Sequence, residues 1–204
     1  MDPNGWRRKR KRALDFPGVS ASPPAHPWET VMSFDLHAAS APVFEAALTN
    51  MIAWLDKARA AGVDEAKLME ARLAPDMKPF PFQFQSASDA AKGAVARLTG
   101  GQAPAMPDTE ASFDELRERL RKTVDYIRSV PAAAYEGGPD RAVEMRFPNG
   151  MGYGWRGADF LTGFALPNFF FHVSMAYALL RANGVQLGKP DFLQHLGPPN
   201  LAAA

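Results

Sequence analysis

The sequence predicts an all-α fold, a four-helix bundle with a small β-hairpin between its third and fourth helices. Three observations predict it. Apolar residues recur with helical spacing in four long segments. Capping residues stand at the starts of several segments and glycines at their ends. One short segment alternates apolar and charged residues before a Pro-Asn-Gly turn, which is typical of a hairpin.

The first main helix is expected from about Asp35 to Ala61, with Gly62 as its stop. Its apolar stripe consists of Phe44, Leu48, Met51 and Leu55. A short helix from Asp64 to Arg72 follows, and its aspartate is a favourable N-cap. An irregular crossing is then expected, because proline breaks helices. The prolines of this crossing are Pro75, Pro79 and Pro81.

The second main helix is expected from about Phe82 to Leu98, ending at Gly100 and Gly101. A loop with several prolines leads to the capping-box signature of residues 112–115, which begins a third helix that ends near Val130. The hairpin follows, with Pro148-Asn149-Gly150 as its turn. Its apolar positions are Val143, Met145 and Phe147.

The fourth main helix is expected from near Ala158 to the Asn183-Gly184 stop. No charged residue occurs in the 21 positions between Asp159 and Arg181, a length that would also cross a bilayer. Asn168, His172 and Ser174 would then face lipid at a cost of several kcal/mol. We therefore expect the central helix of a bundle and no membrane partner.

The first 31 residues differ from the rest, because they combine a basic run, Arg7 to Arg12, with five prolines and no regular apolar period. Such a composition predicts a disordered tail. The basic run is typical of a nuclear-localisation or nucleic-acid patch, but also of a solvated tail, and Met32 resembles a natural start. We favour the last two interpretations. The predicted domains are the tail (1–31), the bundle (32–197) and a flexible C-terminus (198–204).

Composition excludes several classes of site. The chain of 204 residues has no cysteine, which rules out disulfides, cysteine-ligated zinc, iron–sulfur clusters and thiol nucleophiles. A cysteine-free chain is consistent with the cytoplasm, which is the expected location. The tail contains six of the 23 basic residues and three of the 22 acidic residues. The bundle therefore carries a slight acidic excess, and we expect it to bind no nucleic acid.

Several motifs carry a resemblance to a known family. Two of them are RLAPDM at Arg72 to Met77 and ALPNFFFH at Ala165 to His172. The others are Gln83, Gln85, ASDAAK at 87–92 and the segment 183–188. Together they resemble an uncharacterised, domain-of-unknown-function branch of the DinB-like superfamily, over about Met32 to Gly197. The resemblance implies a DinB-like four-helix bundle, often paired as a homodimer, and no settled activity.

The wider superfamily suggests a metal site. Many DinB-like proteins hold a divalent metal with one histidine from the second helix and two from the fourth, and some are thiol-dependent transferases. This sequence departs from that pattern. Its second helix has no histidine, and its fourth has only His172, with Asn168 one turn earlier. We therefore expect no metal and no other cofactor, with carboxylate ligands as the remaining route to a divalent ion.

One set of polar residues remains as a candidate pocket. Asn168 and His172 share a face of the fourth helix, and Gln85 and Asp89 share a face of the second. Asp76 lies in the irregular crossing. If these faces meet, His172 could serve as an acid or base near neutral pH. The alternative is that these groups satisfy one another and the backbone near the proline.

The sequence and the resemblance together therefore predict a DinB-like bundle that binds a small molecule or dimerises. The alternative is a metal-dependent DinB-like transferase or hydrolase. Whether the protein is an enzyme stays open at this point.

Overall fold

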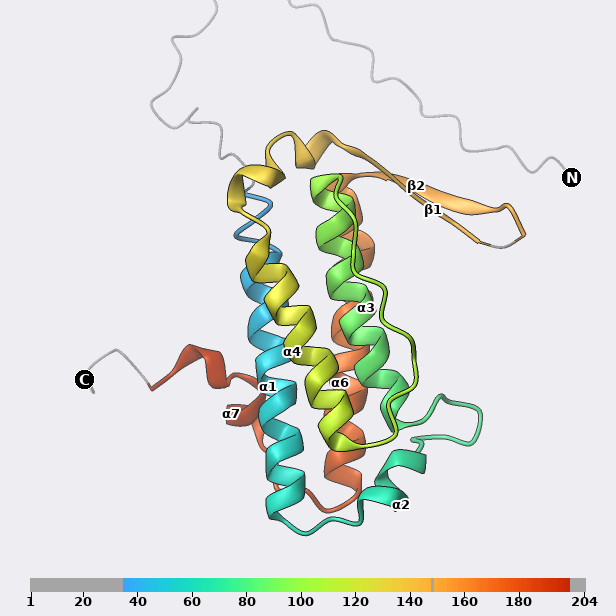
Figure 1. The fold of residues 1–204 in the computed structure, drawn as a ribbon, viewed down its shortest axis with the longest axis vertical. Helices are drawn as coiled ribbons and strands as arrows, with labels where there is room; N and C mark the ends of the chain where they lie inside the picture. The colour runs from blue at the N-terminus through green and yellow to red at the C-terminus, as the bar shows by residue number, and fades with distance from the viewer. Residues whose placement is uncertain (1–34, 148, 199–204) are drawn as a thin grey trace, which may run out of the picture. The chain divides into compact units, whose positions relative to one another are not determined.

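The structure is a computed structural model that describes residues 35–147 and 149–198, shown in Figure 1. It confirms a helical fold with one small hairpin. The four long helices are α1 (Ala41–Ala60), α3 (Phe80–Thr99), α4 (Phe113–Ser129) and α6 (Leu166–Ala182). The tail predicted at 1–31 and residues 199–204 lie outside the described residues, so the predicted domain limits stay predictions.

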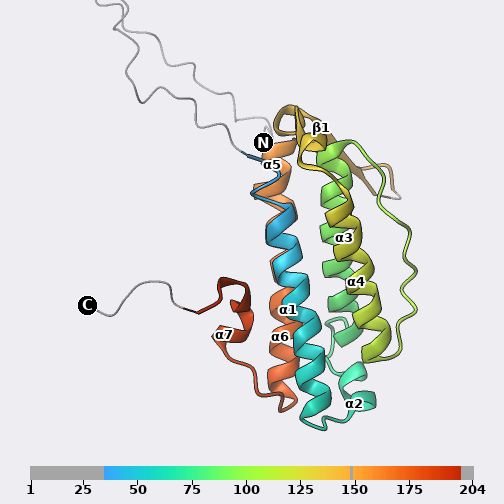
Figure 2. The ribbon, with the colours of Figure 1, turned by 60° about the vertical axis from the view of Figure 1, so that its left-hand side comes forward.

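The four long helices form a bundle in which α1 and α3 lie on a diagonal. Both α1 and α3 pack mainly against α4 and α6. Figures 1 and 2 show that α1 and α6 run in one direction along the bundle, whereas α3 and α4 run in the other. The connection from α1 to α3, which contains α2 (Glu65–Glu70), therefore crosses the end of the bundle diagonally.

Because α3 and α4 are parallel, the chain between them must return along the whole bundle. A helix of the length of α3 spans about 30 Å. Residues 100–112 can span about 45 Å when extended, which is enough for this return. Figure 1 shows this segment running down the outside of α3 and α4. We call residues 100–112 the return segment.

The helix ends follow their capping residues, with two corrections. The predicted start at Asp35 is wrong: residues 36–40 form turns, and α1 begins after Ser40, whose hydroxyl donates to the Leu36 carbonyl at 2.6 Å. Helix α3 begins two residues earlier than predicted, with Pro81 in its first turn, where the missing N–H costs nothing. The predicted cap of α4 is confirmed, because Ser112 accepts from the Glu115 N–H at 3.2 Å.

The bundle core is built from the predicted apolar stripes. Phe44, Leu48, Met51 and Leu55 of α1 are all fully buried. They meet the buried faces of the other three helices, where the largest enclosed side chains are Phe80, Phe84, Phe113, Leu116 and Phe169. The sequence periodicity therefore identified the core faces correctly.

The predicted hairpin is confirmed as β1 (Ala142–Arg146) and β2 (Gly152–Arg156), antiparallel with Val143 opposite Trp155. Two short 3-10 turns, η1 (Ala132–Tyr135) and η2 (Gly138–Asp140), lead into it. Figure 1 shows the hairpin projecting sideways from one end of the bundle. Its base packs tightly, because a Cβ added at Gly157 would lie 2.0 Å from the Gly138 carbonyl oxygen.

The predicted fourth helix is one continuous helical run, Gly157–Ala182, with a wider turn inside it. Its parts are α5 (Gly157–Phe160), the π-helix η3 (Leu161–Ala165) and α6. Proline has no N–H for the carbonyl four residues earlier, and the wider π turn directly before α6 accommodates Pro167. By length and composition this run could cross a membrane, with a mean hydropathy of 1.3 in its most apolar window. In the structure it packs against α3 and α1.

The segment after α6 also folds onto the bundle, which the sequence did not predict. It contains α7 (Lys189–Phe192) and η4 (Gln194–Leu196), and it lies beside α1 in Figure 2. Such short elements carry no periodic signal, and their position depends on contacts with α1.

Candidate functional site

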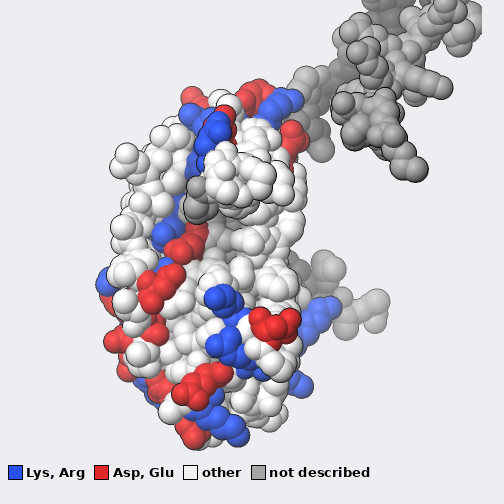
Figure 3. Space-filling model, turned by 90° about the vertical axis from the view of Figure 1, so that its right-hand side faces the viewer, with Lys and Arg blue, Asp and Glu red and all other residues white. Residues whose placement is uncertain are grey.

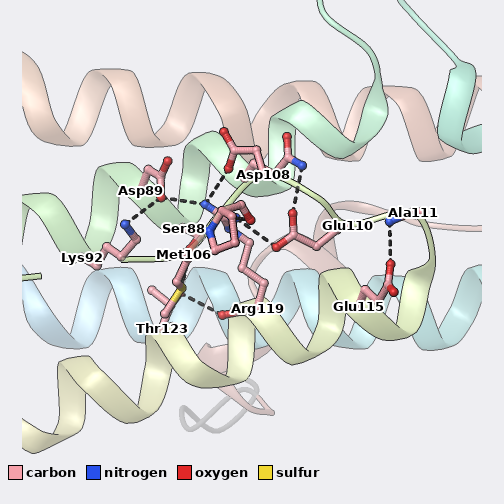
Figure 4. Close-up of polar contacts among 12 residues, drawn as sticks. Ser88, Asp89, Lys92, Met106, Asp108, Glu110, Ala111, Glu115, Arg119 and Thr123 are labelled. Carbon is pink, nitrogen blue, oxygen red and sulfur yellow. Dashed lines mark hydrogen bonds and ion pairs between the residues drawn. The ribbon is translucent and has the colours of Figure 1, made fainter. Parts of the chain in front are cut away.

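The largest polar cluster in the described residues surrounds one buried arginine, Arg119 of α4 (Figure 4). Its side chain is 2% exposed. Nη2 lies 2.7 Å from Asp89 Oδ1 and 3.0 Å from Asp108 Oδ1, and Nη1 lies 2.9 Å from Glu110 Oε1. Nη1 also donates to the Pro107 carbonyl at 3.1 Å. One cation therefore joins α4 to α3 and to the return segment.

A second ring of polar groups supports the carboxylates. Gln85 Nε2 donates to Glu110 Oε2 at 2.9 Å, and Lys92 Nζ lies 2.9 Å from Asp89 Oδ1. Burial alone would raise the pKa of Glu110, but the hydrogen bonds from Gln85 and Arg119 outweigh it and lower the pKa. Glu110 is therefore held as a carboxylate at neutral pH.

The Arg119 cluster extends inward to a smaller neutral contact. The hydroxyls of Ser88 and Thr123 lie 2.7 Å apart, and both approach the Met106 sulfur, at 3.9 and 3.7 Å. The cluster therefore bonds across α3, α4 and the return segment, and only the Nε of Arg119 is left without a hydrogen-bond partner among its buried, described side-chain atoms. The arrangement holds the return segment against the bundle, and its buried charge is matched by carboxylates as burial requires.

His172 of α6 faces α3. Its Nδ1 lies 3.0 Å from Gln83 Oε1, and Gln83 Nε2 donates to the Lys78 carbonyl at 3.1 Å. This second bond orients the amide, so the neutral imidazole donates from Nδ1. The rings of Phe82 and Phe171 pack edge-on at 5.9 and 5.2 Å. Burial lowers the pKa of His172, which favours the neutral ring.

The five predicted pocket residues do not form one contact set. Gln85 and Asp89 belong to the Arg119 cluster, whereas His172 contacts Gln83. The reason is geometric: Gln83 and Gln85 are two positions apart on α3, so they point about 200° apart around the helix. Asn168 is half-buried, and no described residue bonds its side chain; Asp76 is exposed in the α2–α3 crossing.

The residues do not fit the metal site of the wider superfamily. Within residues 35–147 and 149–198, no group of three or more His, Asp or Glu side chains is arranged to hold a metal ion. His172 has an amide and two aromatic rings as neighbours, and the single carboxylate of α3, Asp89, pairs with Arg119 instead.

An apolar chamber of about 350 Å³ lies where the C-terminal segment crosses α1 and α6. Its wall is mostly aromatic and small aliphatic, with Trp54, Phe170, Val173, Phe192 and Ala46 among its lining residues. Asn50 and His195 are its polar lining residues. A more polar hollow, lined by Glu45, Thr49, Arg128 and Gln194, shares Asn50 and His195 with it. We call the first the chamber and the second the vestibule.

Two buried side chains of α1 hold the cover of this chamber in place. Trp54 Nε1 donates to the Asp191 carbonyl at 3.1 Å, and Asn50 Nδ2 donates to the Phe192 carbonyl at 2.8 Å. Lys57 forms an ion pair with the Asp191 carboxylate. These bonds hold the C-terminal segment over one side of the chamber.

An uncovered aromatic face forms a third feature. The hairpin carries Phe147, Met151 and Tyr153, which are 41%, 66% and 58% exposed. Ring contacts continue from Tyr153 through Trp155 to Phe164 of η3, at 5.4 and 5.5 Å. Phe171 of α6 is 52% exposed. We call this set, with Trp155, Phe164 and Phe171, the aromatic face; Figure 3 shows an uncharged band on this side of the molecule below the hairpin.

The diagonal placement of α1 and α3, the return segment and the hairpin before the last helix define a DinB-like helical bundle. The chain belongs to the family described as domain of unknown function (DUF1993), whose profile matches residues 36–193. A similar solved structure is the crystal structure of a DinB family member protein from Shewanella denitrificans. It is 34% identical, with a TM-score of 0.72 over 83% of this chain and 96% of that chain. No curated protein matches.

Sequence reasoning missed the centres of two of these features. Arg119 follows the buried Leu116 at helical spacing, but it lies among exposed charges of α4, and its partners Asp108 and Glu110 lie in a loop. The chamber needs α7, which no sequence pattern indicated. In both cases some of the contacts come from a segment without a secondary-structure signal in the sequence.

Proposed function

We propose that this protein works as a homodimer whose subunits meet through the aromatic face. The observation that carries the proposal is the exposure of large apolar side chains on neighbouring elements, the hairpin and the outer side of α6. Contiguous exposed apolar surface of this kind marks interaction sites on monomers. The family resemblance, which implies a homodimer, supports the same assembly.

The outer side of α6 extends this surface. The stripe Gly163, Pro167, Phe171 and Met175 is exposed or half-buried and carries no charge. A two-fold interface uses the same patch on both subunits. The hairpin of one copy can then cover the stripe of the other, and the reverse contact follows from symmetry.

The charges around the hairpin favour a protein partner over a lipid surface. Arg146 pairs with Glu144 at 2.8 Å, and Arg156 pairs with Asp140. These pairs neutralise two arginines at the hairpin, whereas a helix lying on anionic lipid would be expected to carry unpaired basic side chains. Asn168 and Ser174 add polar groups on the apolar helix, which suit a protein interface better than hydrocarbon.

Light scattering coupled to gel filtration tests this proposal. We expect a dimer for the full chain and a monomer for the pair of variants Phe171→Glu and Tyr153→Lys, because each introduces a charge into the interface. Leu73→Glu is the matched control, since Leu73 is 41% exposed but lies in the α2–α3 crossing. A monomeric full chain, or a dimer that survives both charged variants, would refute the aromatic face as the interface.

A second candidate function is small-molecule binding, and the chamber favours it. Ligand sites are typically apolar cavities of about 300–1,000 Å³ with a few polar groups. The chamber has this size and lining, with Asn50 and His195 as its polar groups.

We also propose that the protein is located in the cytoplasm, because its sequence has no cysteine.

A further inference from the structure

We propose that the chamber binds an uncharged amphiphile, a molecule with an apolar body and one neutral head group that donates a hydrogen bond. The inference rests on the second proposed function, small-molecule binding at the chamber, and names the class of ligand.

We infer the apolar body of the ligand from the side chains that form the wall of the chamber. Trp54 is 1% exposed, and its ring packs against Phe192 at 5.6 Å and Tyr177 at 5.5 Å. Val173 and Phe170 of α6 line the opposite side. Burying alkyl or aryl surface against such side chains is favourable at roughly 25 cal/mol per Å². No acidic or basic side chain lines the chamber except the imidazole of His195.

We infer the neutral head group of the ligand from the polar atoms at the boundary between the chamber and the vestibule. Asn50 is 4% exposed and lines both the chamber and the vestibule. Its Nδ2 donates a hydrogen bond to the Phe192 carbonyl at 2.8 Å and lies 3.5 Å from His195 Nδ1. Its Oδ1 accepts no hydrogen bond from a described residue and is not an enclosed orphan atom, so it is accessible from the hollows that Asn50 lines. An amide oxygen accepts hydrogen bonds, so a ligand O–H or N–H at this boundary can donate to it.

Charged head groups fit this boundary poorly. The two charged residues of the vestibule, Glu45 and Arg128, already pair with each other, with Nη2 and Oε1 2.6 Å apart. A carboxylate or ammonium would need one of these partners and would break the pair. It would also lose part of its hydration beside the apolar wall of the chamber.

The position of the chamber gives the ligand a route in. The cover is the segment 189–196, which is fastened by the bonds from Trp54 and Asn50 rather than by a long packed helix. A short helix such as α7 opens locally more readily than the long helices, because few backbone bonds hold it, and its opening would break the Trp54 and Asn50 bonds.

Isothermal titration of the full chain with a matched octyl series tests the class. The series is 1-octanol, 1-methoxyoctane, octanoate and octylammonium at pH 7.5. We expect saturable binding of octanol, about fivefold weaker binding of the ether, which has no donor for Asn50, and at least tenfold weaker binding of both ions. Equal or tighter binding of either ion, or of the ether, would overturn the proposed class while the site itself stands.

Variants that fill the chamber locate the binding. Ala46→Phe and Val43→Phe each place a ring in the cavity, and we expect both to weaken octanol binding at least tenfold. Ala60→Phe is the matched control on the exposed end of α1 and should leave binding unchanged. Circular dichroism identifies a variant that does not fold, and the other filling variant then decides. Absence of saturable binding by all four compounds would overturn small-molecule binding at the chamber itself.

Discussion

The indole N–H of Trp54 in α1 donates to the backbone carbonyl of Asp191 in α7 at 3.1 Å, which joins positions 137 residues apart in the sequence. With the Asn50 bond to Phe192, it fastens the C-terminal segment across the bundle. The described domain is thus closed by its last short helix, and the chamber exists because of that closure.

Replacing Trp54 with Phe should loosen this cover without removing its aromatic packing. The lost hydrogen bond is worth about 1 kcal/mol, so amide exchange of residues 192–196 should become about fivefold faster. Hydrogen exchange followed by mass spectrometry measures this, with α4 as the internal reference. Unchanged exchange in the cover would show that the bond does not restrain it.

Replacing Arg119 with Met should destabilise the protein strongly. Asp89 and Asp108 are about half exposed, whereas Glu110 is mostly buried, so the uncompensated charge falls mainly on Glu110. We expect a loss of about 2–4 kcal/mol in the free energy of unfolding, measured by urea denaturation. Arg121→Met, at an exposed position of the same helix, should change it by less than about 0.5 kcal/mol. A similar effect from both variants would refute a special role for Arg119.

His172 should make the free energy of unfolding depend on pH. Burial lowers its pKa in the folded state below the ordinary value of 6.5, so the unfolded chain binds more protons as the pH falls. Stability is then fully present above that value and decreases as the pH falls below it. Urea titrations at pH 7.5 and 5 should show a smaller loss for His172→Gln than for the parent chain. An equal loss in both would contradict the assignment.

Deleting residues 1–31 should have little effect on folding. Their composition predicts no buried contacts, so the melting temperature should change by no more than about one or two degrees. Scanning calorimetry of the full and shortened chains measures the difference. A decrease several times larger would show that the segment packs on the bundle.

The sequence predicted the bundle well because its helices carry their own periodic signal. The stripes of α1 and α4 are buried as expected, and the Ser112 cap begins α4 at the predicted residue. The pocket prediction depended instead on which faces of two helices meet, and one helix offers several polar faces. Gln85 and Asp89 were placed toward His172, but Gln83 occupies that position.

The remaining features could not be predicted from local patterns. Two of the carboxylates that pair with Arg119 belong to the return segment. The path of this segment follows from the parallel arrangement of α3 and α4. Asp191 meets Lys57 only after the chain has turned back at Gly184, which has a positive φ of 91°. Such contacts arise from topology, and periodicity within one helix contains no information on them.

The π turn η3 sets which aromatic residues the last helix displays. A π turn holds one residue more than an α turn, and one residue corresponds to about 100° of rotation around a helix. Removing a single residue from Leu161–Ala165 would therefore rotate α6 relative to the hairpin that precedes η3. If the hairpin kept its place, Phe171 would turn inward and a neighbour such as Phe170 would move to the outside. A relative of this protein that lacks the extra residue would carry a nearly identical string of phenylalanines and yet offer a different surface to its partner.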